Sequence, residues 1–205
     1  MKKLIVLDID GVLNNTTFQG EWNKAHWEQG TRAWLEEKFQ SLFYYVSDNH
    51  FYNGYIVPEN LENWNTLIDK TKADVVLSSD WRFVQDGLYN KIETNESIMK
   101  LFKFRGIKGN VVGATPYDKE HFRAREILRY FVFNGIYYPN VDTSDMKVLI
   151  LDDIKDAGYF IPELKKNYKI NCKFMHINNK YGLTKENVQE AIDWFNEVIS
   201  VKGGI

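Results

Sequence analysis

The chain opens with a short apolar run that ends abruptly in carboxylates and a glycine. Residues 4–7 read Leu-Ile-Val-Leu, and Asp8, Asp10 and Gly11 follow within four positions. Such a run is typical of a strand buried on both faces of a parallel sheet, whose neighbouring strands are joined through helices. The sequence therefore predicts an α/β fold in which Asp8 and Asp10 leave the carboxyl end of a strand, where open α/β sheets bind ligands.

Two later segments repeat this pattern of an apolar strand followed by polar side chains. Residues 73–79 end in a pair of serines, and residues 147–153 end in a pair of aspartates. The polar residues at the three strand ends are Asp8, Asp10, Ser78, Ser79, Asp152 and Asp153. One such ending is ordinary turn chemistry. Three of them at one edge of a parallel sheet predict a site for phosphate and Mg²⁺, which prefers carboxylate oxygens.

Helical and strand patterns alternate through the rest of the chain. Apolar periodicity predicts helices at residues 58–70, 95–104, 119–133 and 185–201, and further strands at 109–114 and 171–177. Thr184 is expected to cap the last helix. The alternation predicts a single domain over residues 1–205, built on a doubly wound, Rossmann-like parallel sheet with right-handed crossovers.

Composition restricts the partners and the compartment. The formal net charge of −2 and the pI near 6.1 argue against a broad basic surface for nucleic acid, although they leave room for a local basic groove. The lone Cys172 excludes an intramolecular disulfide and a cysteine-rich zinc site. No apolar stretch approaches membrane-spanning length. We therefore expect a cytoplasmic protein without a membrane partner, and no feature indicates an obligate protein partner.

Four motifs, in this order and spacing, resemble those of the haloacid dehalogenase (HAD) superfamily of phosphohydrolases. Asp8–Val12 is similar to the first motif, Ser78 to the second, Arg123–Ile127 to the third and Leu151–Asp153 to the fourth. A narrower similarity, to the HAD domains of Swiss Army Knife RNA repair proteins, is carried by Val75–Arg82, Val112–Pro116 and Arg123–Ile127.

The resemblance implies a Mg²⁺-dependent phosphatase that acts through an aspartyl-phosphate. Asp8 is then the nucleophile, and Asp10 protonates the leaving oxygen and later deprotonates water. The resemblance places Mg²⁺ between Asp8, the backbone carbonyl of Asp10 and the acid pair, with Asp153 as the direct ligand and Asp152 as a direct or supporting one.

The phosphate ligands implied by the resemblance are hydroxyls and one cation. Ser78 is expected to donate its hydroxyl to a phosphoryl oxygen, with Ser79 assisting in the same loop. Arg123 fits the third-motif spacing, and Lys119 and Arg125 remain alternatives because about one helical turn separates the three.

Residues 14–57 interrupt the alternation and are rich in aromatic side chains. In HAD proteins a segment at this place commonly forms a cap, so the resemblance implies a small cap in which Trp22 and Trp27 stack on a nucleobase. A satellite core of aromatic side chains is the alternative. Arg82 is a further possible substrate contact, and the alternative for this residue is an exposed pair with a surface acid.

The implied substrate is a nucleotide or a nucleic-acid terminal phosphate. A sugar phosphate or another small metabolite phosphate requires the same chemistry beneath a different cap. A non-catalytic binding module on a HAD scaffold is a third hypothesis, and the intact set of acids, serine and arginine weighs against it.

Overall fold

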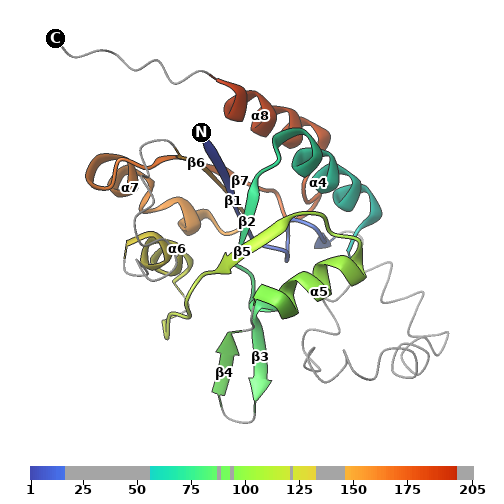
Figure 1. Cartoon of the computed structure of the whole chain (residues 1–205), viewed down its shortest axis with the longest axis horizontal. Coiled ribbons are helices and arrows are strands. Elements are labelled where there is room, and N and C mark those ends of the chain that lie inside the picture. The colour runs from blue at the N-terminus through green and yellow to red at the C-terminus, as the bar shows by residue number, and fades with distance from the viewer. Residues whose placement is uncertain (17–55, 87–88, 93–94, 121, 133–145, 198–205) are drawn as a thin grey trace.

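The computed structural model describes residues 1–16, 56–86, 89–92, 95–120, 122–132 and 146–197. Within these ranges, a five-stranded parallel sheet has the order β5-β2-β1-β6-β7 (Figure 1). Its strands are β1 (Lys2–Leu7), β2 (Asp74–Leu77), β5 (Asn110–Ala114), β6 (Met146–Asp152) and β7 (Asn171–His176). The predicted α/β fold with a Rossmann-like parallel sheet is therefore confirmed.

The register of the central strands explains why distant motifs meet. Leu7 of β1 is paired with Leu77 of β2 on one side and with Leu151 of β6 on the other. The next residues along these three strands are Asp8, Ser78 and Asp152, so the sheet places them at one carboxyl edge.

Helices cover both faces of the sheet. Their bounds are α4 (Pro58–Thr71), α5 (Asn95–Arg105), α6 (Arg123–Val132), α7 (Ile161–Asn167) and α8 (Lys185–Asn196), with short 3₁₀ helices η1 (Asp80–Arg82) and η3 (Lys155–Gly158). Figure 1 shows α4, α5 and α8 on one side of the sheet and α6 and α7 on the other. Because strand side chains alternate, Ile5 and Leu7 pack in the first layer, and Leu4 and Val6 pack in the second.

Two predicted helix boundaries differ from the observed ones by more than one residue. The third-motif helix was expected from Lys119, but α6 begins at Arg123, and Lys119 lies in the preceding turn. The last helix was expected to reach residue 201, but α8 ends at Asn196. Its predicted cap is confirmed, since Thr184 and Asn187 form a reciprocal capping box.

A two-stranded hairpin outside the main sheet was not predicted. Strands β3 (Phe83–Asp86) and β4 (Tyr89–Ile92) are antiparallel, follow η1 directly and project from the body of the fold (Figure 1). Of the expected cap, residues 17–55 lie outside the described part, so the cap remains a prediction. Its two ends lie side by side, because the Val57 amide donates to the Leu13 carbonyl at 3.0 Å. None of the described helices has the length and apolar character needed to cross a bilayer.

Candidate active site

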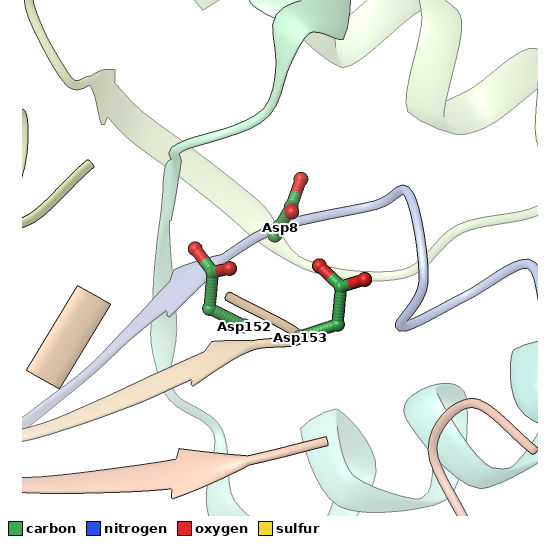
Figure 2. Close-up of side chains that lie close together, drawn as sticks. All are labelled: Asp8, Asp152 and Asp153. Carbon is green, nitrogen blue, oxygen red and sulfur yellow. The ribbon is translucent and has the colours of Figure 1, made fainter. Parts of the chain in front are cut away.

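Three aspartates gather at the carboxyl edge of the sheet. Asp8 follows β1, Asp152 ends the neighbouring β6 and Asp153 follows it, and the three carboxylates lie close together (Figure 2). One oxygen from each of the three lies within 4.8 Å of the others. Asp8 and Asp152 are buried and Asp153 is partly buried. This set of hard oxygen ligands fits a divalent cation such as Mg²⁺.

A glycine is required beside this cluster. Gly11 has a φ of 78°, and a Cβ atom at this position would lie 2.4 Å from Cγ of Asp153. The Gly11 amide donates to Oδ1 of Asn14 at 2.7 Å, which closes the turn. The Asp-x-Asp-Gly sequence therefore lets the loop after β1 pass directly against the acid pair of β6.

The proximity of the acids changes their ionisation. Burial, reinforced by the charge of Asp152, raises the pKa of Asp8 well above its usual value, and the Arg123 guanidinium partly opposes this. Burial also raises the pKa of Asp152 to about 7, again opposed by Arg123. Carboxylates that are this crowded and desolvated are stabilised in their ionised form by a bound cation.

Asp10 is held apart from the three-acid cluster. Its Oδ1 accepts hydrogen bonds from Nδ2 of Asn14 at 2.8 Å and from the indole Nε1 of Trp81 at 3.2 Å. Asp10 is therefore fixed beside the cluster without being one of its three closely spaced acids. Trp81 and Asn14 were not among the predicted site residues, although both lie within four positions of a predicted one.

The serine pair lies one strand away from Asp8, at the end of β2. Both serines are fully buried, and the Ser78 hydroxyl oxygen accepts a hydrogen bond from Oγ1 of Thr115 at 3.2 Å. Ser79 lies inside the turn that leads into η1, where its carbonyl accepts the Arg82 amide. Thr115 was missed as a site residue, although it follows the apolar strand β5 just as Ser78 follows β2.

Among the three candidate cations of the third motif, the structure brings Arg123 to the acids. Nε of Arg123 lies 3.4 Å from Oδ2 of Asp152, and its Nη2 lies 4.0 Å from Oδ2 of Asp8. Arg125 instead pairs with Asp118 at 3.1 Å and with Glu120 at 2.8 Å.

Arg82 does not form the exposed pair that the sequence allowed as its alternative role. Its side chain is 0% exposed, its Nη2 donates to Oε2 of Glu126 at 2.7 Å, and its Nε donates to the Thr115 carbonyl at 3.0 Å. Its closest acid among the described contacts is the buried Glu126 of α6, and the exposed Asp80 lies farther away, with Oδ1 3.8 Å from Nη1 of Arg82. Glu126 was missed, and its only signal was its place three residues after Arg123, on the same helical face. Trp22 and Trp27 lie outside the described residues, so their role is still a prediction.

The five-stranded parallel sheet with helices on both faces, and the acid cluster at its carboxyl edge, fit a HAD-type hydrolase. The chain belongs to the family described as the HAD domain in Swiss Army Knife RNA repair proteins, whose model matches residues 4–188. The resemblance found in the sequence is therefore confirmed. No curated protein and no solved structure gives a significant match to the chain.

Proposed function

We propose that the protein is a Mg²⁺-dependent phosphohydrolase that cleaves phosphate monoesters through an aspartyl-phosphate on Asp8. The observation that carries this proposal is the meeting of Asp8, Asp152 and Asp153 beside the Arg123 guanidinium. A phosphate monoester is a dianion that repels a carboxylate nucleophile, so the reaction needs concentrated positive charge at the attacking oxygen. Asp8, Asp152 and Asp153 would hold Mg²⁺, which supplies that charge and orients the phosphoryl group when it is bound.

In the first step, a carboxylate oxygen of Asp8 attacks phosphorus while the bond from phosphorus to the ester oxygen breaks. Asp10 donates its proton to that leaving oxygen. The Trp81 indole and the Asn14 amide, both bonded to Asp10 Oδ1, orient the acid for this transfer. Arg123 and the Ser78 hydroxyl bind phosphoryl oxygens, and the positive charge of Arg123 favours ionised Asp8.

In the second step, Asp10 is a carboxylate and takes a proton from a water molecule as that water attacks the aspartyl-phosphate. The bond between Asp8 and phosphorus breaks, which releases inorganic phosphate and restores the Asp8 carboxylate. A covalent intermediate divides one difficult displacement into two easier ones.

We propose a nucleotide or a nucleic-acid terminal phosphate as the substrate. The support is the family description, which names RNA repair proteins. A panel of 5′- and 3′-mononucleotides, cyclic-phosphate and 3′-phosphate oligonucleotides, and sugar phosphates tests this proposal by phosphate release. Preference for oligonucleotides that weakens with salt would favour end repair. Preference for sugar phosphates would instead assign the enzyme to small metabolites.

The catalytic proposal is tested with an aryl phosphate, with and without Mg²⁺. We expect Mg²⁺-dependent phosphate release, and a loss of about 10³-fold or more in kcat for Asp8→Asn, because the nucleophile is removed. Asp193→Asn is the matched control, since this exposed carboxylate of α8 contacts Gln189 and lies outside the site. Full activity in Asp8→Asn would contradict the nucleophile assignment, and an inactive wild-type protein would favour the binding module.

A further inference from the structure

A buried chain of alternating charges connects the loop after β2 with the phosphate cation proposed above. Arg82 of η1 donates to Glu126 at 2.7 Å, and Nη1 of Arg123 donates to the same Oε2 atom at 3.3 Å. Arg82 and Glu126 are 44 positions apart in the sequence and come from different elements. The side chains of all three residues are at most 10% exposed, so water does not screen these contacts strongly.

Glu126 is held by three separate groups. Its Oε2 receives both guanidinium groups, and its Oε1 receives the backbone amide of Asp118 at 3.1 Å. Arg82 is anchored in turn by the bond from its Nε to the carbonyl of Thr115, at the end of β5. Burial lowers the pKa of Arg82 to about 10, which leaves this side chain protonated at neutral pH. The position of the Glu126 carboxylate is therefore fixed by Arg82 of η1, which is itself anchored at the end of β5, by Arg123 of the same helix and by the Asp118 amide.

The three outer nitrogens of Arg123 face three different acids. Nη1 lies 3.3 Å from Glu126, Nε lies 3.4 Å from Asp152, and Nη2 lies 4.0 Å from Asp8. A guanidinium is planar and rigid, so fixing two of its nitrogens also fixes the direction of the third. Without Glu126, only the acids of the proposed metal cluster would attract Arg123 in this group of contacts.

We propose that Glu126 is a positioning residue that orients Arg123 toward the phosphoryl group, and that Arg82 fixes Glu126 in turn. This inference rests on the proposed phosphohydrolase function. Its physical reason is that a charged donor stabilises a transition state fully only when it is already in place, and a displacement of about 1 Å costs up to 10²-fold in rate. Because Glu126 also attracts Arg123, the guanidinium is not drawn only toward Asp8 and Asp152.

The first test removes the charge of Glu126 at constant size. We expect Glu126→Gln to lower kcat/KM for an aryl phosphate by about 10- to 100-fold, since Nη1 of Arg123 loses the carboxylate that orients it. Glu120→Gln is the matched control, because this exposed glutamate pairs only with Arg125 among the contacts described here, and it should retain wild-type activity.

A double-mutant cycle separates positioning from a general structural effect. In an Arg123→Ala background, Glu126→Gln should change kcat/KM by less than about threefold, because its effect passes through Arg123. An equal loss in both backgrounds would overturn the proposal, because Glu126 would then act independently of Arg123. An active wild-type enzyme with an equally active Glu126→Gln variant would overturn this inference alone, whereas an inactive wild-type protein would overturn the proposed function and this inference with it.

Glu126→Gln leaves the buried Arg82 without its buried acid, with the exposed Asp80 as a weaker partner at 3.8 Å, and this alone can prevent folding. The double variant Arg82→Gln, Glu126→Gln removes both charges and leaves no buried charge uncompensated at that pair. We expect it to fold, as judged by circular dichroism and a cooperative thermal transition, and yet to show the low activity of Glu126→Gln. Recovery of wild-type activity in the double variant would contradict the proposal, because Glu126 would then serve only to neutralise Arg82.

Discussion

The strand β6 buries a charged side chain near each end, and the two ends treat that charge in opposite ways. Lys147, near the amino end, and Asp152, at the carboxyl end, are each 1% exposed. Nζ of Lys147 donates to the carbonyls of Trp194 and Glu197, each at 2.6 Å, where α8 ends. The fold thus gives this ammonium group the unpaired carbonyls and the negative end of a helix dipole.

Asp152 lies in the reverse situation. Asp8 and Asp153 bring like charges within 4.8 Å of it, and Arg123 is the cation that contacts it directly. Burial, together with the charges of Asp153 and Asp156, raises the pKa of Asp152 to about 7, while the fold gives Lys147 complementary partners. One end of β6 therefore uses a buried charge to hold a helix in place, whereas the other end accumulates charge that a bound ion would balance.

The difference between the two ends of β6 predicts its greatest change in activity for Asp152→Asn. Loss of one oriented carboxylate should lower kcat for an aryl phosphate by about 10²- to 10³-fold. The same change removes a buried charge beside Asp8, so the metal-free variant should unfold at a higher temperature than wild type at pH 8. Phosphate release and thermal unfolding in EDTA measure the two effects. A variant that loses stability as well as activity would show that the carboxyl end also fastens the fold.

The opposite result is expected at the other end of the strand. Lys147→Met should lower the free energy of unfolding by about 2 kcal/mol, because two carbonyls at the end of α8 lose a charged donor, and activity should not change. Lys173→Met on β7 is the control, since its lysine pairs with the exposed Glu190 and should contribute little. Chemical denaturation of the three proteins measures the difference. An equal loss in the free energy of unfolding for Lys147→Met and Lys173→Met would contradict a special role of Lys147 in holding the end of α8.

The site at the carboxyl end of β6 could largely be predicted from the sequence, whereas the partners of Lys147 near its amino end could not. The carboxyl ends of parallel strands lie at the same edge of a sheet, so the sequence pattern predicted that Asp8, Ser78 and Asp152 lie close together. The sequence around Lys147 indicates only the start of a strand, because nothing local shows that the end of α8 packs against this side chain. Partners 47 and 50 positions away are set by packing, which a local pattern does not encode.

The same limit explains the errors around Arg82. Its alternative role as an exposed residue followed from the general preference of arginine for the surface. Its burial depends on Thr115 and Glu126, which reach it only after β5 and α6 have packed. The hairpin of β3 and β4 was missed because its short strands carry polar residues and lack a long apolar run.

A smaller effect concerns pH and Mg²⁺. The pKa of Asp152 is near 3.8 when unfolded and about 7 when folded, so the folded state binds more protons between these values. This contribution to stability is present below pH 4 and is lost as pH rises through 7. Mg²⁺ competes with those protons, so it should stabilise the protein more at pH 8 than at pH 5. We expect the increase in the free energy of unfolding to be greater by about 1 to 2 kcal/mol at pH 8, with a correspondingly larger rise in the unfolding temperature. Calorimetry measures this, and Asp152→Asn should lose most of the Mg²⁺ effect.

The smallest effect separates two arginines on the same helix. Arg123 contacts the acids of the cluster, whereas Arg125, two positions later, pairs with Asp118 and Glu120 and is partly exposed. Arg125→Gln should therefore change the free energy of unfolding by no more than about 0.5 kcal/mol and kcat by less than about twofold. Arg123→Gln should lower kcat by about 10²-fold, since the donor beside Asp8 is lost. A larger loss of kcat in Arg125→Gln than in Arg123→Gln would contradict this assignment. The cation that balances the charge of Asp152 would then be Arg125, on the outer face of α6, and not Arg123.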